Sequence, residues 1–178
     1  MEYIPENKVI DILRAEYDNW IKSLTENEIH AIKKYTYNSM DESPMQFFRR
    51  LNARLREEYN KNDSKMLEKY ANIISDAIKK HSLEHNIICY RGSDFNYIDG
   101  IEKGTIFTLN QFTSTSVIKS KMFAKKYKFI IYAPKGTKGA YIEKLSSFPK
   151  QREFLLDKDC KYKLLYTYKN SVYLEVVV

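Results

Sequence analysis

The sequence predicts an α+β fold in which an N-terminal helical lobe packs on a mostly antiparallel β core. Two observations predict this fold. Apolar residues recur at helical spacing through the first half of the chain, and after His85 they change to short β-type runs separated by turn residues. At 178 residues, of which 43% are hydrophobic, the chain is long enough for one domain with a substantial core. We therefore expect a single domain over residues 1–178, with the helical lobe at about 1–85 and the β core at about 86–178.

Two helices are expected at the start of the chain. Apolar residues at helical spacing predict a first helix over residues 5–24, with Pro5 near its first turn. Thr25 and Glu28 have the spacing of a capping box, in which the side chain of each residue binds the backbone N–H of the other. They predict a short second helix that ends near Tyr35.

Two further helices complete the first half. Ser43, Pro44 and Gln46 repeat the helix-start signature and predict a third helix that continues to about Tyr59. Each helix has one apolar face, so we expect all of them to pack on another part of the protein. The fourth helix is expected to begin at Asp63 or Ser64 and to carry Leu67, Tyr70, Ile74 and Ile78.

The second half is expected to form a sheet of short strands that ends in a hairpin. Gly92, Gly100, Gly104 and the turn Pro134-Lys135-Gly136 separate the apolar runs. Residues 118–126 predict one or two helical turns between strands. The predicted strands cover residues 87–91, 105–109, 111–116, 128–133, 139–143, 153–156, 161–168 and 172–178.

Charge and composition limit the possible partners. The net charge of +7 and the pI of about 9.2 favour anionic partners, which include nucleic acid, acidic lipid, nucleotide phosphates and acidic proteins. The lysines are scattered, with no compact basic run interleaved with aromatics, so binding to nucleic acid is only a secondary expectation. No stretch approaches the roughly 20 apolar residues that a membrane span needs. The two cysteines, Cys89 and Cys160, have no metal-like spacing, and we expect no metal.

Three short motifs occur in order in the β half: Tyr90-Arg91-Gly92, Ser114-Thr115-Ser116 and Gln151-Arg152-Glu153. Each lies at the end or the beginning of a predicted strand. Taken singly, each has an ordinary interpretation as a solvated charge, an exposed edge strand or a pair of outward-facing polar residues. Their conjunction and order on successive strands are more informative.

This order resembles the arginine–serine–glutamate class of bacterial mono-ADP-ribosyltransferase toxins. Phe148 stands three residues before Gln151 and five before Glu153, which is similar to the aromatic–Gln–Glu loop of the clostridial Rho-modifying exoenzymes. The resemblance covers nearly the whole chain and implies a two-sheet β core with an NAD cleft. Other segments that resemble this family are residues 133–142, Leu24-Thr25, Tyr35-Thr36 and Asn52-Ala53-Arg54-Leu55-Arg56.

The resemblance implies that the chain splits NAD and transfers its ADP-ribose, with NAD hydrolysis as a side activity. Glu153 would be the catalytic carboxylate, because the bond from nicotinamide to ribose breaks through an oxocarbenium-like transition state that a carboxylate stabilises. Ser114 would keep this carboxylate ionised by donating a hydrogen bond. Arg91 would bind the diphosphate through its planar guanidinium. The remaining residues implied in NAD binding are Gly92, Asn52, Arg56, Thr115, Ser116 and Phe123.

One loop departs from the family pattern. Phe123 fits the phosphate–nicotinamide loop, in which the family places an arginine shortly after the aromatic residue. Here the following basic residues are Lys125 and Lys126. Lysine keeps the charge but lacks the bidentate fork, so the contribution of this loop to NAD binding is left open.

Gln151 is the position that the resemblance connects with the acceptor. In the family, glutamate here accompanies transfer to arginine and an amide accompanies transfer to asparagine, since two amides can pair donor to acceptor. We therefore expect Gln151 to take part in transfer to an asparagine of a Rho-type GTPase. Phe148 would be an exposed hydrophobic anchor for that protein, and a ring folded inward beside Pro149 is the alternative.

Other functions stay open from the sequence. The acceptor could be an arginine of actin, another protein or a nucleobase, and the chain could instead be a non-enzymatic basic binding module or a decayed toxin that binds NAD without turnover. We expect a monomer that is secreted by a bacterium and acts in the host cytosol if a leader has been removed. A chain that is complete as given would instead be expected in the cytoplasm.

Overall fold

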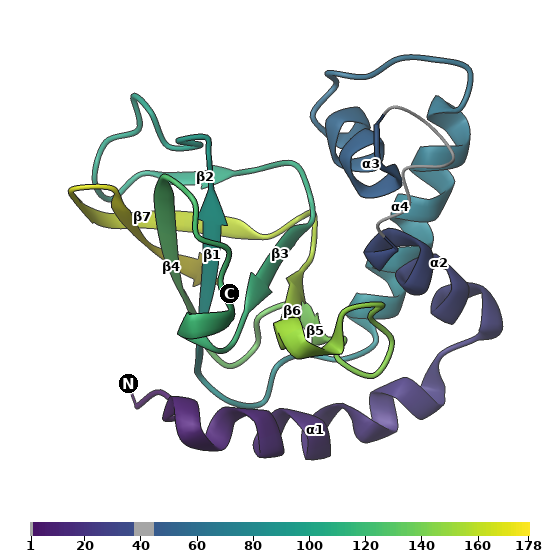
Figure 1. Ribbon diagram of the computed structural model, residues 1–178, viewed down its shortest axis with the longest axis horizontal. Helices are drawn as coiled ribbons and strands as arrows, with labels where there is room; N and C mark the ends of the chain where they lie inside the picture. Colours follow the sequence, from purple (N-terminus) through teal and green to yellow (C-terminus); the bar gives the residue numbers. More distant parts are fainter. Residues whose placement is uncertain (1, 38–44) are drawn as a thin grey trace.

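The computed structural model describes residues 2–37 and 45–178. The helices of these residues are α1 (Glu6–Ser23), α2 (Glu26–Thr36), α3 (Phe47–Leu55) and α4 (Ser64–Lys79), with short 3₁₀ helices η1 (Lys119–Lys121) and η2 (Pro149–Gln151). The strands are β1 (Ile87–Ser93), β2 (Ile106–Thr108), β3 (Thr113–Ser116), β4 (Tyr127–Ala133), β5 (Gly139–Tyr141), β6 (Glu153–Leu156), β7 (Lys161–Tyr168) and β8 (Ser171–Val177). Figure 1 shows α1 along the base of the molecule and α2, α3 and α4 gathered to one side of the strands. The predicted α+β order is confirmed, and every predicted strand is found with its ends within two residues of the prediction.

The signals for helix starts had different outcomes. The capping box is confirmed, because Thr25 Oγ1 accepts from the Glu28 N–H at 3.2 Å and Glu28 Oε2 accepts from the Thr25 N–H at 2.8 Å. The third helix ends at Leu55 and not at about Tyr59, because Glu57 adopts a left-handed φ of 62° that is incompatible with a continuing helix. The predicted start signal at Ser43 and Pro44 lies outside the described residues.

Asp63 occupies the N-cap position of α4 but does not cap it with its side chain. Its carboxylate accepts a hydrogen bond from the Tyr59 hydroxyl at 2.8 Å and forms an ion pair with Arg50 Nε at 3.2 Å. The predicted helix start is therefore confirmed in position, while the side chain joins α3 to the turn before α4.

All eight strands are hydrogen-bonded into one sheet with the order β2-β7-β8-β4-β1-β3-β6-β5. Every pairing is antiparallel except that of β4 with β8, so the predicted mostly antiparallel core is confirmed. The two halves of the sheet meet between β1 and β3, where the register joins a single pair, Tyr90 and Ser116. The two expected layers are thus continuous with each other at this narrow junction, and the cleft described below lies there.

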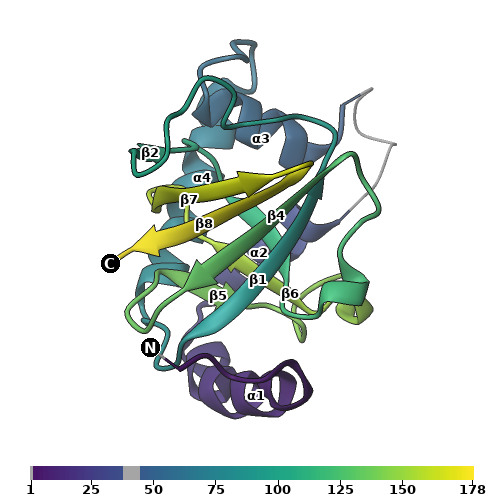
Figure 2. The same ribbon diagram turned by 90° about the vertical axis from the view of Figure 1, so that its left-hand side faces the viewer.

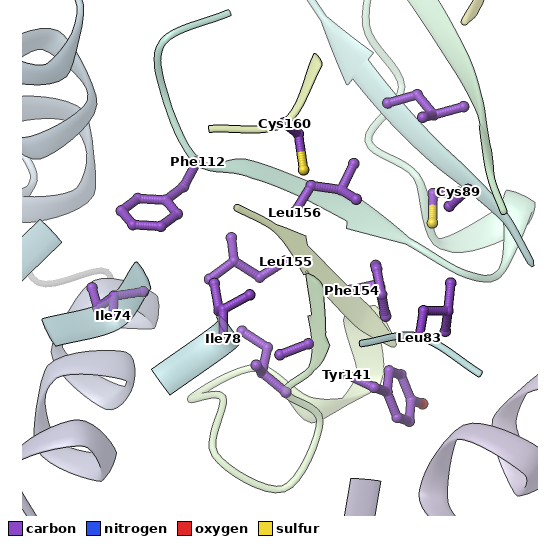
Figure 3. Close-up of a cluster of buried hydrophobic side chains, with 14 of the residues drawn as sticks. Ile74, Ile78, Leu83, Cys89, Phe112, Tyr141, Phe154, Leu155, Leu156 and Cys160 are labelled. Carbon is purple, nitrogen blue, oxygen red and sulfur yellow. The ribbon is translucent and has the colours of Figure 1, made fainter. Parts of the chain in front are cut away.

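The main core lies between the helices and the β3-β6-β5 half of the sheet. Figure 3 shows Ile74 and Ile78 of α4 facing Leu155 of β6, all of them fully buried. Polar contacts fix the position of α1 against this core, since the Tyr17 hydroxyl donates to the Gly139 carbonyl and the Trp20 indole N–H donates to the Ala77 carbonyl, each at 2.8 Å. The helical lobe is therefore fixed against the half of the sheet that carries Glu153.

The two cysteines belong to this packed interior. The thiols of Cys89 and Cys160 are free and buried, and both appear in the hydrophobic cluster of Figure 3. Burial raises the pKa of each thiol to about 12, so both stay protonated at neutral pH. Neither thiol has the character of a reactive nucleophile.

Candidate active site

A cleft opens where β1, β3 and β6 come together, and it contains residues of all three sequence motifs. The 119–123 segment forms one wall and the turn before β6 forms another. The residues that line it are Tyr90, Arg91, Gly92, Ser114, Thr115, Ser116, Lys121, Met122, Phe123, Gln151 and Glu153. Sequence positions separated by more than 60 residues therefore meet in one site.

Strand register explains why the motifs meet. Tyr90 of β1 pairs with Ser116 of β3, and Ser116 pairs with Glu153 of β6. Arg152 has a left-handed φ of 52°, and its carbonyl accepts from the Val117 N–H at 3.1 Å. The Arg152 side chain forms an ion pair with Glu143 outside the cleft, whereas Gln151 and Glu153 on either side of it both line the cleft.

Glu153 is a buried carboxylate, with only 7% of its surface exposed. Burial raises the pKa of Glu153 above its ordinary value, while a hydrogen bond from Ser114 and the charge of Arg91 act to lower it. These two neighbours favour the ionised form, which is the form that can stabilise a developing positive charge. The hydrogen bond from Ser114 to Glu153 is the contact that the resemblance implied between these two residues.

Arg91 is oriented by β3 and retains capacity for an anion. One of its terminal N–H groups donates to the Ser114 carbonyl at 2.8 Å. Its Nε is buried and makes no hydrogen bond within the described residues. An unpaired buried donor is unfavourable, and a phosphate oxygen of NAD would satisfy it. The residues present therefore fit the diphosphate of NAD.

Asn52 does not line the cleft and serves to support it. Its Oδ1 accepts from the Phe112 N–H at 3.1 Å, and its Nδ2 donates to the Tyr35 hydroxyl at 3.0 Å. Burial raises the pKa of Tyr35 to about 12, and Tyr35 is also hydrogen-bonded to Ser114. Asn52 thus acts on Ser114 through Tyr35, a residue that sequence reasoning missed because a tyrosine at helical spacing gives only a core signal.

Arg56 also lies outside the cleft lining. Its guanidinium pairs with Glu58 at 2.7 Å and donates to Gln111. It is close to Tyr97, another residue that the sequence did not single out. Burial would raise the pKa of Tyr97, but hydrogen bonds from Ser93 and Arg91 and the charges of Arg91 and Arg56 lower it overall. Tyr97 is therefore hydrogen-bonded to Arg91 and lies within the field of Arg56, and the resemblance implied both arginines in NAD binding.

The basic residues of the loop after β3 do not all face the cleft. Phe123 is at the rim of the cleft and is 61% exposed. Lys125 forms an ion pair with Asp94 at 2.8 Å and Lys126 lies over the Tyr127 ring, so neither faces the cleft, and Lys121 is the lysine that lines it. The family pattern points to basic residues after Phe123, whereas Lys121 precedes it, so the sequence did not single out this lysine.

Gly92 is required by this same loop. A Cβ atom at position 92 would come within 2.0 Å of the Phe123 carbonyl oxygen, so only glycine allows the loop to lie against the end of β1.

Phe148 does not line the cleft. It is 41% exposed on the loop before η2, as expected for an anchor on the surface and not for a ring folded inward.

The family model for ADP-ribosyltransferase exoenzymes matches residues 14–175, which is most of the chain. The chain belongs to the ADP-ribosyltransferase exoenzyme family. The family that the motifs resembled is thereby confirmed. NAD is the co-substrate of this family, as expected, and within the described residues no group of three or more His, Cys, Asp or Glu side chains is arranged to hold a metal ion.

Individual relatives of the chain differ in length and likeness. The NAD(+)–arginine ADP-ribosyltransferase EFV of Enterococcus faecalis is 35% identical over 162 residues, which cover 84% of this chain and 31% of that protein. The chain thus spans about a third of the length of this curated relative.

Solved structures of the family share the fold. Plx2a, an ADP-ribosyltransferase toxin of Paenibacillus larvae, has a TM-score of 0.75 at 25% identity, with 99% of this chain and 98% of the toxin covered. The C3 exoenzyme of Clostridium limosum has a TM-score of 0.73 at 22% identity, with 95% of each chain covered. A relative from S. aureus, solved with NAD, has a TM-score of 0.74 at 18% identity, with 100% of this chain and 98% of its own covered. No helix of residues 2–37 and 45–178 is long and apolar enough to cross a membrane.

Proposed function

We propose that this domain breaks the bond between nicotinamide and ribose in NAD and transfers the ADP-ribose to a protein side chain. The observation that carries the proposal is the cleft in which Arg91, Ser114 and Glu153 meet although they are far apart in the sequence. These three residue types supply the phosphate contact, the orienting hydroxyl and the carboxylate that this chemistry needs.

In the proposed reaction Arg91 binds the diphosphate through its fork of N–H groups, including the buried Nε that has no partner among the described residues. Glu153 accepts a hydrogen bond from a ribose hydroxyl and stabilises the positive charge that develops on the ribose. The electron pair of the broken bond goes to the nicotinamide nitrogen, and the acceptor nitrogen attacks the same carbon and then loses a proton. Ser114 holds Glu153 in one orientation throughout. When water replaces the acceptor, the result is slow NAD hydrolysis.

For the acceptor we propose an asparagine of a Rho-type GTPase, as the Gln-x-Glu motif suggests. Gln151 lines the cleft beside Glu153, and its amide can both donate to and accept from an incoming asparagine amide. Among the described residues that line the cleft, Glu153 is the only carboxylate. An arginine acceptor would therefore find no second carboxylate in this lining to engage its guanidinium. Phe148, on the same loop, would contact the protein around that asparagine.

Arginine is the competing acceptor, because the 35% identical relative is an arginine ADP-ribosyltransferase. Labelled NAD incubated with a eukaryotic cell lysate, followed by mass spectrometry of the labelled protein, distinguishes the two. A modified asparagine on a small GTPase supports the proposal, and a modified arginine overturns the choice of acceptor while keeping the enzyme class. Action on a host protein also requires that the enzyme be secreted and reach the host cytosol, and we propose that it acts there as a monomer.

Gln151 variants separate NAD chemistry from acceptor choice. Gln151→Ala should leave nicotinamide release largely intact, because Arg91, Ser114 and Glu153 remain. Protein labelling should fall by about two powers of ten, the scale expected when a site loses the group that pairs with its substrate. Gln151→Glu should also fail on asparagine, because a carboxylate cannot donate to the amide oxygen. Loss of both activities together in Gln151→Ala would place Gln151 in the NAD site instead.

A further inference from the structure

One face of the sheet carries a row of aromatic and apolar side chains that the catalytic site does not use. Strand register places Tyr90, Ile130, Tyr173 and Tyr166 side by side across β1, β4, β8 and β7. In β4 and β8 the residues on either side of Ile130 and Tyr173 are buried on the opposite face, and the register places Tyr90 and Tyr166 on the same side as these two residues, so the row points away from the core. Tyr132 follows in the next row, and we call these five residues the tyrosine face.

No helix of the described residues covers the tyrosine face, and the Tyr3 ring packs edge-on against Tyr132 at its border, with centroids 5.3 Å apart. Figure 2 views β7, β8, β4 and β1 from this side, and α2, α3 and α4 lie behind the sheet. Tyr166 is 46% exposed, and its ring stacks on Tyr173 with centroids 4.2 Å apart and planes 15° apart. Tyrosines that are already held by stacking lose little conformational freedom when a partner binds, which suits them as anchors of an interface.

The charges around the tyrosine face have mainly one sign. By register, Lys128, Lys161 and Lys163 project from the same side of β4 and β7 as the tyrosines. Within the described part of the chain none of these three lysines forms an ion pair; Glu175 lies opposite Lys163 on the same face, and Glu6 is near Tyr90 at its edge. An apolar centre bordered by unpaired lysines is complementary to a partner with an acidic rim around an apolar patch.

The tyrosine face is also next to the catalytic cleft. Tyr90 ends the row and also lines the cleft. Two residues further along β1, Gly92 packs against the backbone of Phe123, which belongs to the segment that forms one cleft wall. A partner that covers this face would therefore reach the cleft at the Tyr90 end of the row. The protein that receives ADP-ribose must occupy such a position.

We propose that the tyrosine face is a docking surface for the acceptor protein, which contacts it through an acidic patch with an apolar centre. This proposal rests on the transferase function proposed above. It adds a second contact region to the loop of Phe148 and Gln151, and it predicts that acceptor recognition depends on residues that have no part in NAD chemistry.

The test measures two activities of each variant, namely nicotinamide release from NAD without acceptor and labelling of lysate proteins at limiting acceptor. The face variants are Tyr166→Ala and Lys163→Glu. Lys65→Glu on α4 is the matched control, because it makes the same change of charge at an exposed lysine outside the face. We expect each face variant to lower the labelling rate by about tenfold or more while nicotinamide release stays at the wild-type rate, and the control to leave both unchanged.

Each alternative has its own outcome. Equal labelling by wild type and both face variants overturns the docking surface while the transferase function stands. Absence of any labelled protein with the wild type overturns the transferase function and this proposal with it. Wild-type binding to phosphatidylserine-containing vesicles that Lys163→Glu abolishes, with labelling unchanged, identifies the face as a membrane surface. A dimer seen by sedimentation that Tyr166→Ala dissociates, with labelling unchanged, identifies it as a contact between two copies of the chain.

Discussion

Glu143 and Glu153 stand at the two ends of one loop, are equally buried, and have pKa values that move in opposite directions. Glu143 is 8% exposed and Glu153 is 7% exposed. Burial raises the pKa of both carboxyl groups. For Glu143, hydrogen bonds from Arg14 and Tyr141 and the charges of Arg14 and Arg152 outweigh burial, so its pKa lies below the ordinary value of 4.5. For Glu153, Ser114 and Arg91 do not outweigh burial, and its pKa lies above that value.

The difference shows that burial alone does not mark a catalytic carboxylate. Arg14 forms two hydrogen bonds with Glu143, at 2.7 and 3.1 Å, and the Tyr141 hydroxyl donates a third at 2.7 Å. With Arg152 added, Glu143 has no capacity left for a substrate. Glu153 has a single hydroxyl partner and faces a cleft, so it can accept a hydrogen bond from a ligand.

The two sites are nevertheless connected. The ion pair between Glu143 and Arg152 joins the beginning of the loop to the residue before Glu153, and the Ile142 N–H donates to the Glu153 carbonyl at 3.1 Å. The saturated carboxylate thus holds the ends of the loop together, and the loop in turn presents Gln151 and Glu153 to the cleft.

The largest effect should come from removing the charge of Glu153. Glu153→Gln should lower nicotinamide release by about two to three powers of ten, because the lost interaction is strongest in the transition state. Affinity for NAD, measured by titration calorimetry, should change little. The matching change Glu143→Gln should leave a far larger part of the activity, and similar losses in the two variants would remove the distinction between the carboxylates.

Arg91→Lys should have the next largest effect. Lysine keeps the positive charge but loses the bidentate geometry and the Nε donor, so NAD should bind about tenfold more weakly. Thermal unfolding of the variant must be checked beside NAD titration, because Arg91 also donates to the Ser114 carbonyl. A folded variant with unchanged NAD affinity would refute the phosphate role.

Stability should respond to the two glutamates with opposite signs. The pKa of Glu143 is lowered by folding, so its charge stabilises the folded state above the unfolded pKa, and this contribution is lost as the pH falls through the folded pKa. Glu143→Gln should therefore cost about 1–3 kcal/mol at pH 7, and less at acid pH. The pKa of Glu153 is raised by folding, so its charge destabilises the folded state at neutral pH, and Glu153→Gln should raise the melting temperature. Melting temperatures at pH 7 and pH 4 check both, and a stabilising Glu143→Gln would show that its partners do not favour the charge.

Ser114→Ala should have the smallest effect on turnover at neutral pH and a clear effect on its pH dependence. The hydrogen bond from Ser114 lowers the pKa of Glu153, so its removal should raise that pKa further. The acid side of the pH profile of nicotinamide release should then move to higher pH, since more of Glu153 is protonated at a given pH. An unmoved profile would show that Ser114 positions the carboxylate without affecting its charge.

The fold could be predicted largely because its signals are local. Short β-type runs separated by turn residues located every strand, and the Thr25–Glu28 spacing located the start of α2. The parallel pairing of β4 with β8 and the joining of both sheet halves at Tyr90 and Ser116 depend on contacts between distant segments, which spacing does not report.

The site residues that belong to short motifs could be predicted from the sequence. The residues that support the site through contacts between distant segments could not. Arg91, Ser114, Gln151 and Glu153 lie in recognisable triplets and meet in the cleft. Asn52 and Arg56 were placed in NAD binding because of the resemblance, whereas their side chains bind Tyr35 and Glu58 outside the lining. The supporting roles of Tyr35, Tyr97 and Lys121 arise only from the tertiary structure.

Release of nicotinamide from NAD by the purified protein, with no acceptor present, tests the central claim most directly. The account predicts steady release that saturates with NAD, accompanied by an equal amount of free ADP-ribose, because Arg91, Ser114 and Glu153 suffice to break the bond when water is the acceptor. Absence of release above the buffer rate at saturating NAD would contradict it, and would leave the cleft as a binding site for NAD without turnover.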